Sequence, residues 1–249
     1  MFFRFIILIA LLATNTVKAI EKNPDLHKLE KITGCSFIGW IQRGERWTFQ
    51  DWMEDKRSTI YPILDALKIF EEVQPSKDSY DYAIVLGSLH QSIEKRLGYL
   101  IKQWNLGVRY KRIIFLTGRR KLDPKKEPFE ELNTETDLMV YLWGNMDKDP
   151  ELGEVPLDII DARALPFNSR PTTLNTVETW LDQNPITGTC IVFSNQPFVQ
   201  YQHQVLTSLL GKRFDVNTVG PAGGENTKLS ILLDSVAKTE LTKQGYLLL

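Results

Sequence analysis

The sequence predicts an α/β protein with a three-layer, Rossmann-like fold: a mostly parallel sheet of about five strands between two layers of helices, preceded by an amino-terminal extension. Five apolar runs each end in a small or polar residue, and a helical pattern follows each of them. Near-continuous apolar runs are typical of strands buried on both faces, and their alternation with helices is typical of a parallel sheet. The runs cover residues 82–87, 112–118, 157–161, 190–195 and 214–220.

Residues 1–19 have the pattern of a secretory signal peptide. Arg4 gives a charged start, residues 5–13 are apolar, and the segment ends in Val-Lys-Ala. The apolar stretch is shorter than the roughly 20 residues that a membrane span needs. We therefore predict an exported, periplasmic protein that has no membrane span once the signal is removed. Because Val-Lys-Ala is an imperfect cleavage site, an uncleaved amino-terminal anchor is the alternative.

The charge balance gives no support for general affinity for nucleic acid. Beyond residue 19 the chain carries 28 basic and 31 acidic side chains, so its formal net charge is −3. Binding to the phosphate backbone of nucleic acid needs an excess of positive charge. Any anion site must therefore be local.

The cysteines and histidines predict no metal site. The three histidines are far apart in the sequence, and no C-x-x-C motif occurs. In an exported protein Cys35 and Cys190 could form a disulfide, but a cysteine inside an apolar strand, as Cys190 is, more often serves as a small hydrophobe. Both alternatives stay open at the level of the sequence.

Residues 20–79 form the predicted extension. This segment holds Trp40, Trp47 and Trp52, half of the six tryptophans. Large aromatic side chains usually serve burial, so we expect the extension to pack on the core and cover one side of the sheet, with a helix at about residues 59–72. The alternative is that the aromatic cluster forms a platform for a sugar or a partner.

Residues 80–249 form the predicted α/β domain. Between the second and third runs, residues 119–131 are dense in Lys, Pro and Glu, which is typical of a solvated loop. The helix after that loop begins near Asn133, whose side chain can cap it. The predicted helices of the domain cover about residues 91–104, 133–142, 172–181, 199–209 and 227–241.

The carboxyl ends of the strands predict a ligand site, because open α/β sheets bind ligands there. At Gly87-Ser88 the backbone can approach a ligand closely, and the free N–H groups of the next helix face the same space. Gly118 repeats this arrangement with Arg119 beside it. A phosphate or carboxylate would satisfy both. The alternative is that the glycines are simple turn residues and that Arg119 and Arg120 lie in water.

Two further polar segments follow strands. Residues 173–179 concentrate hydroxyl, amide and carboxylate groups where a helix begins. Asn175 and Glu178 can form a pair resembling a capping box, which accounts for two of these groups and leaves Thr176 unexplained. The end of the fourth run adds three hydrogen-bonding side chains, Ser194, Asn195 and Gln196.

On these residues the chain resembles the YdcF/SanA/ElyC-like family, a bacterial domain of poorly defined function. The family pattern has a strand ending in Gly, an Arg in the next helix, a strand ending in Ser/Thr-Gly-Gly, a Glu opening the helix after it, and a Ser-x-Asn-Thr-x-Glu-Asn segment. The matching positions, within about residues 80–205, are Gly87, Arg96, Thr117-Gly118, Glu135 and residues 173–179.

The chain departs from the family pattern at two places. Arg119 stands where the second glycine is usual, and residues 194–200 lack the histidine and arginine that normally follow the fourth strand. If those residues do chemistry in the family, this chain is an altered member that binds without turning over. The resemblance implies a ligand site in an envelope protein linked to cell-wall precursors and barrier maintenance.

Two common enzyme classes are disfavoured. Ser88 and His90 do not form a G-x-S-x-G elbow, and no G-x-G-x-x-G follows the first strand. No cofactor has a signature. The first hypothesis is therefore an exported protein that binds, and in its catalytic form hydrolyses or transfers, a phosphorylated or nucleotide-like small molecule or a lipid-linked cell-wall precursor. The second is a non-catalytic interaction protein with a protein partner and a vestigial pocket.

The first hypothesis assigns roles to twelve residues. Glu135 or Glu178 is the candidate general base. Arg96 adds positive charge or fixes Glu178. The candidate ligand-binding residues are Gly87, Ser88, Arg96, Gly118, Arg119, Asn175, Thr176, Ser194, Asn195 and Gln196.

Overall fold

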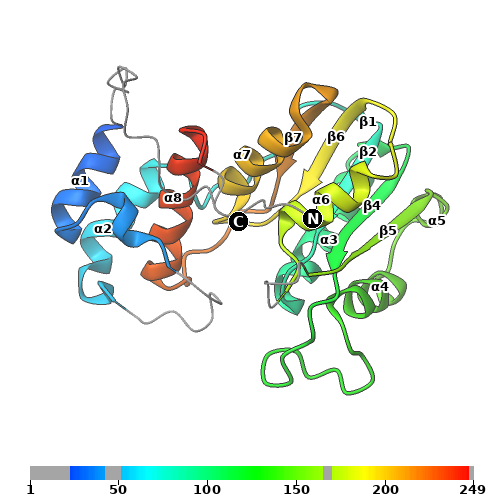
Figure 1. Cartoon of the computed structure of the whole chain (residues 1–249), viewed down its shortest axis with the longest axis horizontal. Coiled ribbons are helices and arrows are strands. Elements are labelled where there is room, and N and C mark those ends of the chain that lie inside the picture. Colours follow the sequence, from blue (N-terminus) through cyan, green and yellow to red (C-terminus); the bar gives the residue numbers. More distant parts are fainter. Residues whose placement is uncertain (1–22, 43–51, 165–169, 247–249) are drawn as a thin grey trace, which may run out of the picture.

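The computed structural model describes residues 23–42, 52–164 and 170–246. Its centre is an all-parallel sheet of five strands in the order β5-β4-β2-β6-β7 (Figure 1), which confirms the predicted α/β fold. The strands are β2 (Tyr82–Leu86), β4 (Ile113–Gly118), β5 (Leu157–Ala162), β6 (Gly188–Phe193) and β7 (Phe214–Val219).

The strand order creates a reversal point between β2 and β6. From β2 the chain builds outward to β4 and β5, then crosses back to β6 and β7 on the other side of β2. Ligands of open α/β sheets bind in the crevice at such a point, outside the carboxyl ends of the strands. Val85 pairs with Phe193, so the loops that begin at Gly87 and Asn195 leave the sheet at the same level.

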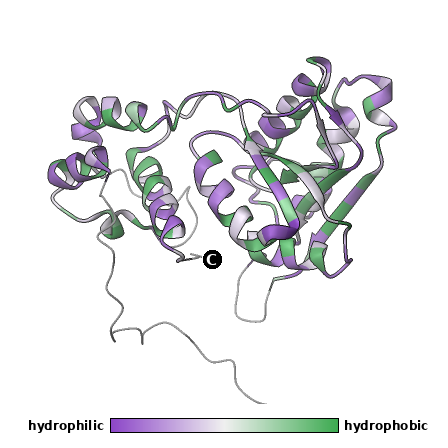
Figure 2. Cartoon of the chain, turned by 90° about the horizontal axis from the view of Figure 1, so that it is seen from above, coloured by the Kyte–Doolittle hydropathy of each residue, from purple (hydrophilic) through white to green (hydrophobic). Residues whose placement is uncertain are grey.

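Helices cover both faces of the sheet (Figure 1), and the strands between them carry many hydrophobic residues (Figure 2). Val85 and Phe115 belong to the core cluster of α3 and α4, whereas Ile84 and Ile114 belong to the cluster of α6 and α7. This alternation follows from the two-residue period of a strand. The helices are α3 (His90–Asn105), α4 (Glu135–Asn145), α6 (Thr173–Leu181) and α7 (Val199–Leu210).

The described part of the extension forms a helical lobe beside the α/β domain (Figure 1). The lobe contains α1 (Pro24–Thr33), the short 3-10 helices η1 (Phe37–Trp40) and η3 (Glu54–Lys56), α2 (Arg57–Ala66) and the last helix, α8 (Leu229–Lys243).

The lobe has a hydrophobic core of its own, separate from the two clusters of the sheet. Trp40 is fully buried in it, and its indole N–H donates to the Thr33 hydroxyl at 3.1 Å. The extension therefore packs on α8. We had expected it to cover one side of the sheet, and its described residues do not. Trp47 lies outside the described residues.

Two helix boundaries differ from the prediction for local reasons. Helix α2 ends at Ala66, well before residue 72, because Lys68 takes a left-handed conformation with φ of 59°. Helix α4 is capped by Thr134 in a capping box with Asp137, and not by Asn133. The remaining short elements are the parallel pair β1 (Ser79–Tyr80) and β3 (Arg109–Tyr110), α5 (Pro150–Gly153) and η4 (Gly211–Arg213).

Both cysteines are free thiols. Cys35 is half-buried against the helical lobe, whereas Cys190 is buried in β6 within the sheet core. Burial raises the pKa of the Cys190 thiol to about 12. Of the two alternatives, the structure supports a small buried hydrophobe at Cys190.

Candidate functional site

The crevice at the reversal point is filled by Arg96. This side chain comes from α3, is 1% exposed, and donates to the carbonyl oxygens of Leu86 at 2.7 Å and Gly87 at 2.8 Å. Its Nε also donates to Oδ1 of Asn195 at 2.9 Å. Arg96 thus joins the end of β2 to the end of β6. The sequence left open that Arg96 fixes Glu178, but Arg96 does not pair with that residue.

Glu135 lies against the ends of β2 and β4. Its Oε1 accepts from the Gly118 N–H at 3.3 Å and its Oε2 from Nε of Arg120 at 3.1 Å. A β-carbon at Gly87 would overlap the Glu135 carboxylate, so only glycine fits there. Glu135 is 9% exposed, and burial raises its pKa above the ordinary value although Arg120 and Arg96 act in the opposite direction.

Arg120 is the centre of this buried network. Its Nη1 and Nη2 donate to the two carboxylate oxygens of Glu127 at 2.7 and 2.9 Å, and Nη2 also donates to the Ser88 carbonyl at 2.9 Å. The backbone N–H of His90, at the start of α3, donates to Glu127 at 3.2 Å. Arg120 and Glu127 are 8% and 1% exposed. They lie at the strand ends, and not in solvent.

Four ionisable side chains therefore share one buried edge of the sheet: Arg96, Arg120, Glu127 and Glu135. Taking such groups out of water costs several kcal/mol each unless charges and hydrogen bonds compensate. Buried clusters of this kind are common where a protein handles a charged ligand, although structural networks also produce them. Ser88 is half-buried beside them, and its hydroxyl makes no hydrogen bond within the described residues.

The polar residues after β6 are committed to the fold. Ser194 is fully buried and its hydroxyl donates to the Gln202 side chain. Asn195 holds Arg96 and also donates to the Gln196 carbonyl at 3.0 Å. Gln196 donates to the Glu71 carbonyl at 2.7 Å, while its Oε1 is buried and has no hydrogen-bond partner among the described residues. Of the three, only Asn195 contacts the buried ionic network.

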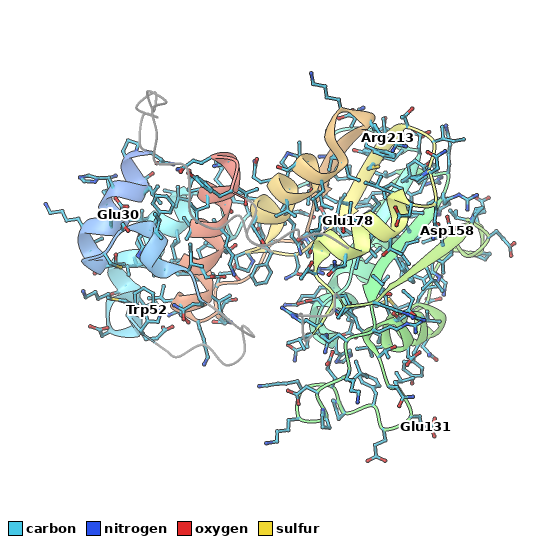
Figure 3. All side chains as sticks on the ribbon, viewed as in Figure 1. Glu30, Trp52, Glu131, Asp158, Glu178 and Arg213 are labelled. Atoms are coloured by element: carbon cyan, nitrogen blue, oxygen red, sulfur yellow. The ribbon has the colours of Figure 1, made fainter. Side chains whose placement is uncertain are left out.

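The polar side chains at the start of α6 cap the helix. Oδ1 of Asn175 accepts from the Thr172 N–H at 2.9 Å, which completes a capping box between Thr172 and Asn175. The Thr176 hydroxyl donates to the Thr173 carbonyl at 2.9 Å. Glu178 is exposed on the outer side of α6 (Figure 3). The site hypothesis requires Asn175 and Glu178 to lie beside Arg96 and Glu135. The structure does not bring these four side chains together.

Arg119 also lies apart from the buried network. Its side chain is 50% exposed, and its Nε donates to Asp161 at the end of β5 at 2.6 Å. The hydroxyl of Thr136 donates to the same carboxylate at 2.8 Å. Arg119 thus closes an ion pair at the edge of the sheet. It is the guanidinium of Arg120 that contacts Glu135 and the Ser88 carbonyl at the strand ends.

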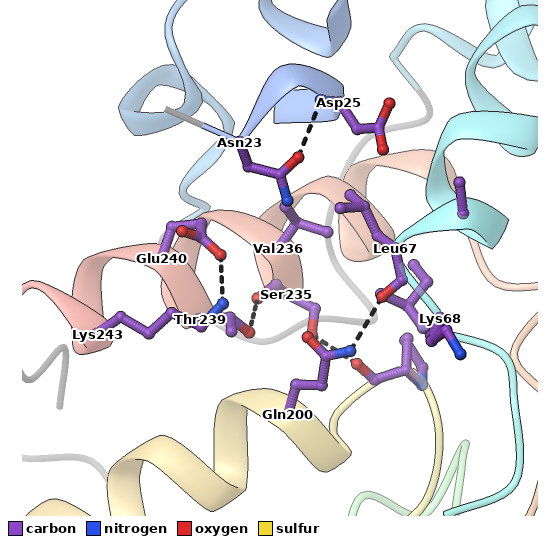
Figure 4. A pocket seen from close by; sticks show the side chains of 13 residues that line it. Asn23, Asp25, Leu67, Lys68, Gln200, Ser235, Val236, Thr239, Glu240 and Lys243 are labelled. Atoms are coloured by element: carbon purple, nitrogen blue, oxygen red, sulfur yellow. Dashed lines mark hydrogen bonds and ion pairs between the residues drawn. The ribbon is translucent and has the colours of Figure 1, made fainter. Parts of the chain in front are cut away.

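A cavity of about 270 Å³ lies between the helical lobe and the loop after β6 (Figure 4). Pro197, next to Gln196, forms part of its wall, and no predicted site residue lines it. Two of its polar side chains are bonded within the wall: Gln200 donates to the Leu67 carbonyl at 3.0 Å and Ser235 to the Pro197 carbonyl at 2.8 Å. The cavity lies on the side of the loop after β6 that faces the helical lobe.

Sequence reasoning missed Arg120 and Glu127 because the composition of residues 119–131 suggested a solvated loop. The available signal was the presence of large apolar residues among the charges. Leu122, Phe129 and Leu132 pack against the sheet core and draw the loop inward.

Comparisons of the chain with protein-family models, with curated proteins and with solved structures found no match. Of the residues that the structure describes, none belongs to a helix long and apolar enough to cross a membrane. Across the same described ranges, no three or more His, Cys, Asp or Glu side chains are grouped so that they could hold a metal ion. The chemistry of the strand ends is thus the basis for assigning a function.

Proposed function

We propose that this protein binds a small molecule through a phosphate or carboxylate group at the carboxyl ends of β2 and β4. The observation that carries the proposal is the burial of two guanidinium groups, those of Arg96 and Arg120, at the sheet edge where α/β proteins bind ligands. Gly87 and Gly118 lack side chains, which lets the Glu135 carboxylate and the Pro171 ring approach the two strand ends closely. A planar guanidinium pairs with either anion through two parallel hydrogen bonds.

The proposed ligand is encountered outside the cytoplasm. The support is the signal-like pattern of residues 1–19 and the resemblance to the YdcF/SanA/ElyC-like family. A phosphorylated or nucleotide-like molecule and a lipid-linked cell-wall precursor both carry the required anion. Under this proposal the mature protein begins at residue 20, and an uncleaved anchor would hold the same domain at the outer face of the membrane.

Turnover, where it occurs, would use Glu135 as the general base. A carboxyl group whose pKa is raised can both take and return a proton closer to neutral pH than an ordinary one. Glu135 also lies within hydrogen-bond reach of the Gly118 N–H, at the floor of the proposed site. Glu178 is left out of this role because it is exposed on α6.

The proposal is tested by a thermal-shift screen of sugar phosphates, nucleotides and prenyl phosphates on the chain from residue 20 onward. A ligand at 100 times its Kd stabilises the folded state by about 2.7 kcal/mol. Arg120→Lys keeps the charge but loses the two-pronged geometry, so it should weaken the response at least tenfold. Glu178→Gln is the exposed control and should respond like wild type. Equal responses in wild type and Arg120→Lys would exclude this site.

A second function is favoured by a different observation. Arg96, Asn175 and Ser194 already have hydrogen-bond partners within the protein. A non-catalytic interaction protein would retain such a closed edge and meet its partner elsewhere, and Ile38 on the helical lobe is 58% exposed. A screen without hits, together with a crosslinked partner that Ile38→Asp no longer captures, would favour this alternative.

A further inference from the structure

The Glu127 carboxylate lies in a complete set of anion-binding groups. Its two oxygens accept from both terminal nitrogens of Arg120 at 2.7 and 2.9 Å. The His90 N–H donates to one oxygen at 3.2 Å and the Asp123 N–H to the other at 3.1 Å. The side chain is 1% exposed. A guanidinium fork with backbone N–H groups is the donor set that proteins use for carboxylate and phosphate groups.

Of the three donor residues, Arg120 and His90 come from a different part of the fold than the carboxylate, whereas Asp123 belongs to the same segment as Glu127. Arg120 lies two residues after β4, and His90 opens the long helix α3, so both are fixed by the sheet and its helices. Glu127 instead belongs to the excursion of residues 121–134, which starts and ends at a bridge between Lys121 and Thr134. The tip of this excursion, with Glu131, projects away from the domain (Figure 3).

The excursion can release Glu127 without unpairing a strand of the main sheet. Within the described residues it contacts the core through the partly buried side chains of Leu122, Phe129 and Leu132, and the ring of Phe129 lies 4.8 Å from that of His90. After release, Arg120 still holds Glu135 through its Nε at 3.1 Å. The guanidinium would then keep one carboxylate partner and offer two free donors.

We infer that Glu127 is an internal ligand: its carboxylate occupies the subsite for the anionic group of the small molecule, and a phosphate or carboxylate of that molecule replaces it when the excursion of residues 121–134 moves out. This inference rests on the proposed function, since it names the position of the anion at the same site. It also accounts for the burial of the Glu127 carboxylate at the proposed anion site. The half-buried Ser88 hydroxyl beside Arg120 is then left for a further oxygen of the ligand.

A self-bound carboxylate lowers the apparent affinity for an external anion. If the closed form accounts for about 90% of the molecules, the apparent Kd is raised about tenfold over that of the open form. Removing the carboxylate should therefore raise the affinity for inorganic phosphate and for acetate, which replaces the lost group. Removing a carboxylate from the tip of the same excursion should not.

The experiment measures the binding of inorganic phosphate and acetate to wild type, Glu127→Ala and the matched control Glu131→Ala, by titration at constant ionic strength. The expected result is saturable binding to Glu127→Ala at least tenfold tighter than to wild type, with Glu131→Ala unchanged. If wild type and Glu127→Ala bind phosphate equally, an anion site exists but Glu127 does not close it. If neither binds phosphate, both the inference and the proposed anion site fail.

Should the loss of the carboxylate in Glu127→Ala leave Arg120 too poorly compensated for folding, refolding supplies a second measurement. The yield of folded Glu127→Ala should then rise with added phosphate or acetate and not with chloride at the same ionic strength. Rescue by chloride as well would mean general screening of charge and would overturn the inference. Glu127→Gln keeps the shape of the side chain without its charge and should show a smaller gain than Glu127→Ala.

Discussion

Replacing Arg96 by methionine tests whether this side chain holds the two halves of the sheet edge together. The substitution keeps most of the apolar stem and removes the donors to Leu86, Gly87 and Asn195. These acceptors are next to a side chain that is 1% exposed, so water does not readily replace the lost donors. Each buried acceptor left unsatisfied costs about 1–3 kcal/mol.

The expected loss is about 3–5 kcal/mol of unfolding free energy, the range found when one partner of a buried charged cluster is removed. The loss should grow between pH 5 and pH 7. Arg96 lowers the pKa of Glu135, so without it that carboxyl has a still higher pKa in the folded state. A carboxyl with a raised folded-state pKa stabilises the fold at pH values below its unfolded pKa, and this stabilisation is lost as the pH rises through the folded value.

Urea unfolding of the chain from residue 20 onward measures this loss. With a slope of about 2 kcal/mol/M, the unfolding midpoint should fall by about 2 M. Arg112→Met is the matched control, because Arg112 is 45% exposed and its ion pair with Asp158 should contribute under about 1 kcal/mol. Equal losses in the two variants would refute the bridging role of Arg96, and equal losses at both pH values would refute its coupling to Glu135.

Three further predictions concern single positions. Gly87→Ala should lower the unfolding free energy by about 2–3 kcal/mol in a urea titration, because its β-carbon would overlap the Glu135 carboxylate. Gly98→Ala, in open space on α3, should instead raise the unfolding free energy by about 0.5–1 kcal/mol. Hydrogen bonds from Lys111 and from the Thr189 backbone lower the pKa of Asp81 to about 2. Asp81→Asn should therefore lower the unfolding free energy by about 1 kcal/mol at pH 7, and this difference from wild type should vanish as the pH falls from about 4 to 2. If the proposed signal peptide is removed on export, mass spectrometry of the protein from cells should find cleavage after Ala19, whereas an intact amino terminus would support the anchor.

The sheet could be predicted from the sequence because its inner strands, such as β2 and β4, are buried on both faces. Runs such as residues 82–86 and 113–116 are apolar at every position, a pattern that surface strands do not show. The place of the extension could not be predicted in the same way. Its apolar residues pack on α8, at the far end of the chain, and a helical stripe shows that a helix is buried but not which surface buries it.

The strand ends could be located from the sequence, but not which side chains meet there. Glu135 and Arg96 were found through the resemblance to the YdcF/SanA/ElyC-like family, whose pattern has an Arg in the helix after the first strand and a Glu opening the helix after the second. Asn175 and Thr176 have the same polar character but satisfy the first turn of α6, since capping and ligand binding use the same side chains. The paired burial of Arg120 and Glu127 depends on how a loop folds back, which local composition does not specify.

The loop after β6 couples the buried network to the helical lobe. Asn195 accepts from Arg96 at 2.9 Å, Gln196 donates to the Glu71 carbonyl at 2.7 Å, and Pro197 accepts from Ser235 of α8 at 2.8 Å. Three consecutive residues are thus anchored to α3, to the segment after α2 and to α8. A displacement of the helical lobe must therefore move the residue that holds Arg96.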